Sequence, residues 1–436
     1  MTRAERIREF LEDELQLVPQ LFAKPIEQGV PVSGKVYGFE ELVLGIEAVL
    51  DGWWTSGKYS IQFARKLARF LTVRHAILTN SGSSANLLAI SALTSEQLGD
   101  RRLQPGDEVI VPATSFPTTV NPIIQNRLVP VIVDIQLGHY NLDTDALERA
   151  VSPRTRAIVA AHTLGNPFDL DRTMEIARRR NLWVVEDACD ALGARWRGKM
   201  VGSFGDLSTG SFYPAHHLTT GEGGAVYTNR PRLKTIVESF RDWGRDCWCD
   251  TGCDNTCGKR FTWQQGSLPY GYDHKYTYSH IGYNLKMTDI QAAIGLAQIA
   301  RLPGFIERRS QNFKVLHERL TDLNDQLILP CHHPDAEPSW FGYPITLRSG
   351  QTPPRREIIA GLEQAGIHTR LLFAGNVLRQ PAYQGSALRV SGSVPVADYV
   401  MHHTFWVGVY PGLGTDSMHF IADTLQEILR RSVRPA

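Results

Sequence analysis

Short apolar runs alternate with segments of helical periodicity across residues 40–230. The runs, which have the length of buried strands, are HAILTN, DEVIVPAT, VPVIVDI, RAIVAAHT and LWVVEDA. The segments with apolar residues at helical spacing include SSANLLAISAL and DRTMEIARRR. This alternation predicts an α/β fold, with a mostly parallel sheet covered by helices on both faces. The runs GSFY and GGAVYTN predict two further strands.

Two segments do not follow this strand–helix alternation. Residues 3–18 place Ile7, Phe10, Leu11, Leu15 and Val18 at helical spacing, which predicts an amphipathic helix. Residues 243–280 have no clear period and carry four of the six cysteines. We expect this second segment to be an insertion that something other than an apolar core holds together.

The last third of the chain predicts a smaller α/β unit. A long helix is expected to begin near Met287 and to break at Pro303, because proline removes a backbone donor. Strand-like runs (FGYPITL, HTRLLF) and a final helix (DTLQEILRRS) follow. The predicted division is an N-terminal helical segment, a large domain that contains the insertion and a small C-terminal domain, at residues 1–35, 36–295 and 296–436.

Composition narrows the class of protein. The 436 residues include 46 Lys+Arg and 45 Asp+Glu, a formal charge of +1, and 42% are hydrophobic. Near-neutral charge without basic blocks argues against nucleic-acid or anionic-membrane binding. No apolar stretch reaches the roughly 20 residues of a membrane helix, and the first residues are too acidic for a signal peptide. We therefore expect a cytoplasmic protein, in which the cysteines are not paired as disulfides.

Two positions at strand ends could bind an anionic, aromatic ligand. Ser-Gly-Ser-Ser between HAILTN and the next helix could present backbone N–H groups to a phosphate, although it lacks the Walker and Rossmann spacings. Asp187 ends the strand LWVVEDA, where open α/β sheets bind ligands. A buried aspartate needs a cationic or hydrogen-bonding partner, and a protonated pyridine nitrogen would serve. A helix N-cap is the alternative role for Asp187.

Four cysteines within eleven residues indicate a metal site. Cys247, Cys249, Cys253 and Cys257 lie closer together than chance spacing would give. Clustered thiolates in a reduced compartment are typical metal ligands. Cysteine spacing alone leaves zinc and an iron–sulfur cluster equally possible.

Three motifs together resemble one enzyme family. SGSSAN, VEDACDALGA and SFYPAHHLTTGEGG are similar to the sugar aminotransferases (DegT/DnrJ/EryC1/StrS) of the fold-type I pyridoxal-phosphate superfamily. His216 stands where those enzymes carry the Schiff-base lysine, and no lysine occurs between Lys199 and Lys234. A covalent internal linkage to the cofactor is therefore excluded there, whereas imidazole can still move protons.

The cysteine spacing narrows the resemblance to one branch. Histidine at the lysine position, combined with Cys189-x57-Cys247-x-Cys249-x7-Cys257, resembles the sugar-nucleotide 3-dehydratases typified by CDP-4-keto-6-deoxyglucose 3-dehydrase. The resemblance extends over nearly the whole chain, including FRDWGRDCWC, GYDHKYTYSH and YPGL. It implies pyridoxamine 5'-phosphate (PMP) and a [2Fe-2S] cluster as cofactors. It also implies a homodimer and a flavin- and iron–sulfur-containing NAD(P)H-dependent reductase as electron donor.

The resemblance assigns roles to individual residues. It implies that His216 is the catalytic base and that Asp187 pairs with the pyridine nitrogen. Cys189, Cys247, Cys249 and Cys257 would hold the cluster, with Cys253 and Cys331 as spectators. The implied phosphate ligands, stacking residue, dehydratase-specific position and further pocket residues are Gly82, Ser83, Ser84, Ser211, Asn284 (from the neighbouring subunit), Phe116, Asp190, Tyr213 and Phe341. For His217 we expect no direct role.

Several functions stay open from sequence. The expected substrate is CDP-4-keto-6-deoxyglucose, for 3,6-dideoxysugar synthesis and lipopolysaccharide O-antigen, and a TDP-linked 4-keto-2,6-dideoxy sugar is the alternative. A pyridoxal-phosphate aminotransferase conflicts with the missing lysine. A glutamate-dependent dehydratase without external reductant conflicts with the cysteine pattern. A zinc-stabilised scaffold without catalytic activity would contain zinc without iron or sulfide.

Overall fold

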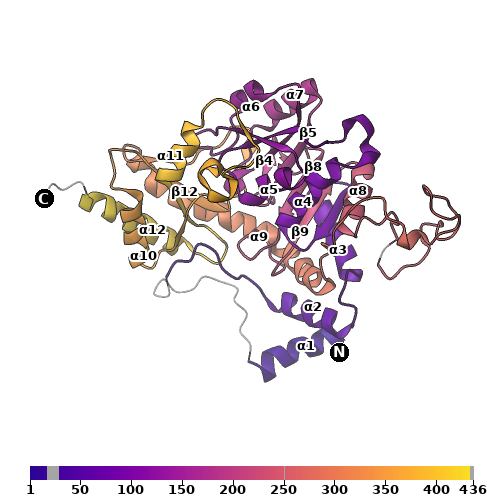
Figure 1. The fold of residues 1–436 in the computed structure, drawn as a ribbon. Helices are drawn as coiled ribbons and strands as arrows, with labels where there is room; N and C mark the ends of the chain where they lie inside the picture. The colour runs from indigo at the N-terminus through magenta and orange to yellow at the C-terminus, as the bar shows by residue number, and fades with distance from the viewer. Residues whose placement is uncertain (17–28, 250, 433–436) are drawn as a thin grey trace.

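The computed structural model describes residues 1–16, 29–249 and 251–432 (Figure 1). Its main element is an eight-stranded sheet in the order β1-β9-β8-β5-β4-β2-β3-β14. Strands β8, β5, β4, β2, β3 and β14 are mutually parallel, while β9 is antiparallel to both β8 and β1. The predicted α/β class is confirmed. The bounds are β1 His75–Thr79, β2 Glu108–Pro112, β3 Val129–Val133, β4 Thr155–Ala161, β5 Trp183–Asp187, β8 Leu207–Ser211, β9 Gly224–Thr228 and β14 Arg389–Val390.

The sheet is buried on both faces because its strands are apolar at nearly every position. Successive side chains of a strand point to opposite faces, so Val109 and Val111 join one core while Ile110 joins another. The first core contains residues of α4 (Gly82–Leu93), α5 (Pro117–Gln125) and α8 (Pro231–Arg241). The second contains residues of α6 (Thr144–Ala150) and α7 (Leu170–Arg180), at the opposite side of the sheet (Figure 1).

A second, four-stranded sheet lies near the C-terminus (Figure 1). Its order is β10-β12-β15-β13, all antiparallel, with bounds Leu327–Ile328, Gly342–Leu347, Thr404–Gly408 and Thr369–Arg370. It packs on α10 (Arg355–Gln364), α12 (Thr415–Ser432) and the end of α9 (Asp289–Leu320). Residues 372–400, which include the first six residues of α11 (Pro395–His403), return to the core of the large sheet. The predicted domain boundaries remain a prediction.

The predicted break at Pro303 is wrong. α9 runs through Pro303 without interruption from Asp289 to Leu320. Pro303 is exposed, and the carbonyl that loses its helical donor is that of Ile299, four residues earlier. Packing of α9 on α2 (Phe39–Leu50), α3 (Lys58–Phe70) and α12 outweighs the lost bond.

The N-terminal segment forms a helix, α1 (Arg3–Glu9), which continues as a π-helix over Phe10–Glu14. Of the predicted apolar stripe only Leu11 is buried, while Phe10 and Leu15 are exposed. Val18 lies outside the described residues.

The described part of segment 243–280 is mostly loop and extends from the sheet beside α8 (Figure 1). Its regular structure is one 3-10 turn, His274–Tyr276. The remaining short elements of the chain are β6 Arg195–Trp196, β7 Lys199–Met200, β11 Ala336–Glu337 and the 3-10 turns Glu96–Arg101, Thr163–Gly165, Thr321–Leu323, Val377–Arg379 and Pro381–Tyr383.

Candidate active site

Strand ends and one helix start converge at the carboxyl edge of the large sheet. β5 ends at Asp187, β8 ends at Ser211, and α4 begins at Gly82. A Cβ added to Gly82 would lie 2.5 Å from the Cβ of Ser211 and 3.1 Å from the Sγ of Cys189. Only glycine fits this close approach. The Ser81 hydroxyl caps α4 by accepting a 3.0 Å bond from the Ser84 N–H, and such a helix N-terminus favours an anion.

Asp187 is held by hydrogen bonds from several neighbouring elements. One carboxylate oxygen accepts from Asn86 Nδ2 at 2.9 Å and from Thr119 Oγ1 at 2.7 Å. The other lies 3.4 Å from Thr209 Oγ1, which donates more closely to the side-chain oxygen of Asn86, at 2.6 Å. The carboxylate is therefore nearly buried yet fixed in orientation, as a partner for a cationic nitrogen must be. It does not cap a helix, which was the alternative role.

Two aromatic rings of the site are open to solvent. Phe116, the N-cap residue of α5, is 50% exposed and touches Phe373 edge-on at 6.2 Å between ring centroids. Tyr213 is 52% exposed. Phe116 therefore keeps a ring face that core packing would have covered.

His216 lies in a mostly buried group of ionisable side chains beside this edge. Its Nδ1 is 3.5 Å from Asp190 Oδ1, without hydrogen-bond geometry. The guanidinium of Arg309, which is 1% exposed, donates to the carbonyl oxygens of Phe341 at 2.9 Å and of His216 at 3.2 Å. The rings of His216 and Phe341 are 5.1 Å apart. Arg309 thus fixes the backbone of the loop that carries His216.

Burial controls the protonation of this group. Loss of solvation, helped by the positive charge of Arg309, lowers the pKa of His216 to about 4. Loss of solvation and the nearby charge of Asp187 raise the pKa of Asp190 to about 7. Near neutral pH His216 is therefore an uncharged imidazole with a free lone pair, the form a proton acceptor requires.

Phe341 and His217 are both buried beside His216. The ring of Phe341 lies 5.1 Å from that of His216, and its role in the pocket remains a prediction. His217 is also buried, and its Nε2 lies 2.9 Å from the carbonyl oxygen of Ser339. This contact agrees with the expectation that His217 has no direct role.

The phosphate-turn residues divide between the site and the surface. Ser211 is buried next to Gly82, while Ser83 is exposed at the start of α4 and contacts Thr118 Oγ1 at 3.2 Å. Asn284 is exposed and accepts a hydrogen bond from Lys286 Nζ at 2.7 Å.

The cysteines fall into two separate places. Cys189 Sγ lies in the pocket of Asp187 and Gly82, 4.0 Å from Thr209 Oγ1. Cys247, Cys249 and Cys257 meet in segment 243–280, where the Cys257 N–H donates to Cys249 Sγ at 3.3 Å. Among the residues that the structure describes, the donors close enough to share a metal are those of Cys247, Cys257 and His274, within 4.8 Å of one another. The structure therefore does not bring Cys189 to this group.

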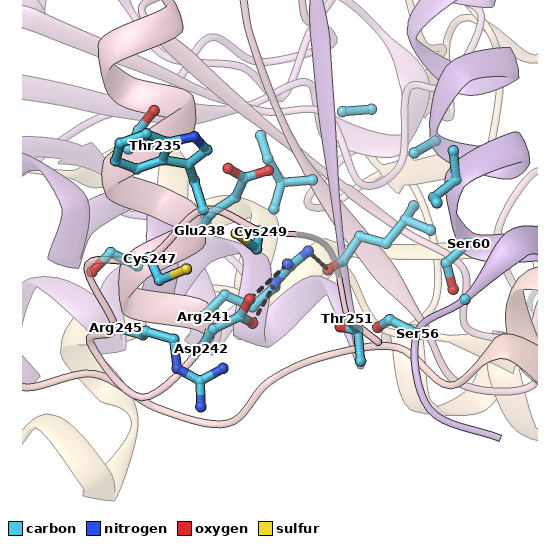
Figure 2. Close-up of a pocket in the computed structure, with 18 of the residues that line it drawn as sticks. Ser56, Ser60, Thr235, Glu238, Arg241, Asp242, Arg245, Cys247, Cys249 and Thr251 are labelled. Atoms are coloured by element: carbon cyan, nitrogen blue, oxygen red, sulfur yellow. Dashed lines mark hydrogen bonds and ion pairs between the residues drawn. The ribbon is translucent and has the colours of Figure 1, made fainter. Parts of the chain in front are cut away.

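A polar cleft separates the cysteine loop from the body of the protein. It is lined by α3, β1, the end of α8 and the first residues of segment 243–280. Figure 2 shows Cys247 and Cys249 on its wall, near the ion pair of Arg241 with Asp242. Burial raises the pKa of Cys247 to about 11, whereas hydrogen bonds from Thr256 and Cys257 outweigh burial at Cys249 and lower its pKa to about 7.

Sequence reasoning did not single out five residues of these sites. Asn86, Asp246 and His274 lay inside quoted motifs (SGSSAN, FRDWGRDCWC and GYDHKYTYSH), so the motifs contained their signal, and Thr119 lies three residues after Phe116. Arg309 had no local signal, because its partners are distant in sequence.

Comparison with known proteins identifies the family. Residues 39–426 match the profile of the DegT/DnrJ/EryC1/StrS aminotransferase family, and the chain belongs to this family. It is 54% identical over 420 residues to the lipopolysaccharide biosynthesis protein RfbH of Salmonella typhimurium, covering 94% of this chain and 96% of that protein. It is 50% identical over 400 residues to the dTDP-4-dehydro-2,6-dideoxy-D-glucose 3-dehydratase of Saccharopolyspora spinosa, covering 92% and 86%.

Solved structures agree with this assignment. The Escherichia coli GDP-4-keto-6-deoxy-D-mannose-3-dehydratase with bound hydrated PLP superposes with a TM-score of 0.82 at 28% identity, covering 91% of this chain and 99% of that one. The fold-type I architecture is thereby confirmed, and the chain lies in the sugar-nucleotide 3-dehydratase branch of its family. Among the described residues, no helix combines the length and apolarity needed to cross a bilayer.

Proposed function

We propose that this enzyme removes the C3 hydroxyl of a nucleotide-linked 4-keto-6-deoxyhexose, using PMP and an iron–sulfur cluster. The observation that carries the proposal is the mostly buried imidazole of His216, 14% exposed, in the position of the family's lysine. Its Nδ1 has no hydrogen-bond partner among the described residues. An imidazole there can accept and return a proton, but it cannot hold the cofactor covalently.

The residues of the sheet edge fit a dissociable PMP. The N-terminus of α4 with Ser211 suits the phosphate. The open face of Phe116 suits the pyridine ring, and Asp187 suits a protonated ring nitrogen. When bound, the cofactor supplies a primary amine for the sugar ketone and a conjugated ring that accepts electrons. Asp187 holds the ring-nitrogen proton, and its bonds from Asn86 and Thr119 keep the carboxylate in place.

His216 is the proposed proton carrier. With the cofactor bound, its imidazole would take up a proton from the C4' position, because burial keeps the imidazole unprotonated at neutral pH. Asp190 lies 3.5 Å from Nδ1 without hydrogen-bond geometry, and its pKa of about 7 leaves this carboxyl partly protonated near neutral pH. Arg309 fixes the loop and so limits the distance that the imidazole can move.

Complete deoxygenation at C3 needs two further electrons. A [2Fe-2S] cluster in segment 243–280 supplies single-electron transfer when bound. We propose a flavin- and iron–sulfur-containing NAD(P)H-dependent reductase as donor, and a cytoplasmic homodimer in which Asn284 reaches the partner's phosphate site. The exposure of Asn284 supports this last role.

CDP-4-keto-6-deoxyglucose is the proposed substrate, for a deoxysugar of lipopolysaccharide. The 54% identity to a lipopolysaccharide biosynthesis protein supports it. A dTDP-linked 4-keto-2,6-dideoxyglucose is the second candidate, favoured by the 50% identity to a dTDP-sugar 3-dehydratase.

The test is an anaerobic assay of the purified protein with PMP, a ferredoxin-type reductase system and each 4-keto sugar nucleotide. The expected result is a 3-deoxy sugar from the CDP substrate. Turnover of the dTDP substrate alone would replace the first candidate by the second. Amino-sugar formation from glutamate, or a stoichiometric lysine adduct after pyridoxal phosphate and borohydride, would refute the proposal.

A further inference from the structure

Phe373 is the aromatic neighbour of Phe116. Its ring meets the Phe116 ring edge-on, with 6.2 Å between the centroids and 79° between the planes. Among the residues that the structure describes, no other aromatic ring contacts Phe116, which is 50% exposed. An edge-on contact covers at most one face of a ring. Phe373 can therefore hold Phe116 in one orientation and still leave a face open to a ligand.

The backbone of Phe373 has a conformation that bulky residues rarely adopt. Its φ angle is +46°, in the left-handed region that glycine enters easily. Other residues stay in this region only where the surrounding structure fixes them, and such residues concentrate at functional sites. The Phe373 side chain is partly buried against the core of the large sheet. The fold therefore maintains an unfavourable backbone angle at the residue whose ring contacts Phe116.

Hydrogen bonds fasten the segment after Phe373 to the loop before Phe116. Three of them join residues 374–377 to residues 113–115: Ala374 N–H to the Ser115 carbonyl at 3.3 Å, Val377 N–H to the Ala113 carbonyl at 2.9 Å, and Thr114 Oγ1 to the Gly375 carbonyl at 2.7 Å. Further along, the Tyr383 hydroxyl donates to Asn121 Oδ1 at 2.8 Å, within α5, the helix that Phe116 caps. The two rings are thus held together by their backbones as well as by their own contact.

The segment before Phe373 belongs to the small sheet. β13 (Thr369–Arg370) ends three residues earlier, and the Leu371 carbonyl accepts a hydrogen bond from Trp406 Nε1 in β15 at 3.1 Å. Phe116, in contrast, follows β2 of the large sheet. The contact between Phe373 and Phe116 therefore joins the small C-terminal sheet to the carboxyl edge of the large one.

We propose that Phe373 is a positioning residue, which holds the ring of Phe116 in the orientation that stacks on the pyridine ring of the cofactor. Through Phe373 the placement of the small sheet then contributes to cofactor affinity. The proposal rests on the proposed function only in taking Phe116 as the residue that stacks on PMP.

The test measures the Kd of PMP for the full-length protein without sugar nucleotide, by equilibrium dialysis. Phe373→Leu is the main variant, because leucine keeps the site apolar while removing the ring. We expect the Kd to rise by about three- to tenfold, the order that an aromatic pair contributes. The circular dichroism band of bound PMP, measured at saturation, should weaken because Phe116 is no longer fixed in one orientation. A rise of less than about threefold with an unchanged band would overturn the proposal.

Three further variants separate the ring from the backbone and from general stability. Phe373→Tyr keeps the ring and should bind PMP like the wild type; a loss equal to that of Phe373→Leu would overturn the proposal. Phe373→Gly suits the backbone angle but lacks the ring, so wild-type affinity in this variant would also overturn it. Leu378→Ala is the matched control, because Leu378 is partly buried against the same core, and its Kd should not change. An equal loss in Leu378→Ala would show that the effect is destabilisation.

A crystal structure of the wild type with PMP tests the proposal without any variant. It should show Phe116 stacked on the pyridine ring, with Phe373 still edge-on to Phe116. A structure in which Phe373 has moved away from a stacked Phe116 would overturn the positioning role and leave the proposed function intact. Wild-type protein that binds no PMP would overturn both.

Discussion

Replacing Asp190 by asparagine should remove a loss of stability that the wild type suffers as pH rises from about 4 to about 7. The folded state raises the pKa of Asp190 from 3.8 to about 7, because the side chain is buried beside the charge of Asp187. Between these values the folded chain keeps a proton that the unfolded chain has lost. The stability of the wild type therefore falls as pH rises toward about 7, and asparagine, which cannot ionise, removes this loss.

The magnitude follows from the two pKa values. Their difference of about three units, at about 1.4 kcal/mol each, corresponds to a total of about 4 kcal/mol. At pH 5 the wild type has already lost about 1.5 kcal/mol of this stabilisation. The free energy of unfolding of Asp190→Asn, relative to the wild type, should therefore increase by about 2.5 kcal/mol between pH 5 and pH 8. His216, whose pKa is lowered, acts with the opposite sign in both proteins, so its effect cancels in the difference.

Urea unfolding of the cofactor-free wild type and Asp190→Asn at pH 5, 6, 7 and 8 measures this difference, provided that the slopes agree. Glu337→Gln, an exposed carboxylate, is the control and should show no such trend. A difference between wild type and Asp190→Asn that stays constant within about 0.5 kcal/mol from pH 5 to 8 would refute the reasoning, because Asp190 would then be ionised throughout.

Two further predictions concern the site. His216→Asn should abolish solvent exchange of the cofactor's C4' hydrogen, measured by NMR, and should leave the visible spectrum of the cluster unchanged. In the wild type the exchange rate should fall only as pH drops toward about 4, because His216 is unprotonated above that pH. Exchange that persists in the variant would show that another group is the base. Cys247→Ser should preserve this exchange but block formation of the 3-deoxy product, measured by chromatography under anaerobic conditions. Loss of both activities would mean that Cys247 serves folding.

Local patterns in the sequence were sufficient for seven of the eight strands of the large sheet, because most of them are apolar runs that burial on two faces demands. β14 (Arg389–Val390) was not predicted. The N-terminal stripe and Pro303 show where this reasoning fails. Phe10 stays exposed although its spacing is helical, and Pro303 is accommodated because one lost hydrogen bond is small against the packing of a 32-residue helix.

The sequence motifs identified which residues could be catalytic. The tertiary structure showed which of these residues lie in contact with one another. Asp187 at a strand end and His216 in place of lysine could be identified because a motif is local. The protonation of His216 depends on Arg309, 93 residues away, and the donor beside Cys257 is an imidazole oriented by Asp246, 28 residues before it. The sequence gives only the order of the side chains along the chain. The burial of a side chain, its protonation state and its contacts with other donors depend on distances in the folded structure.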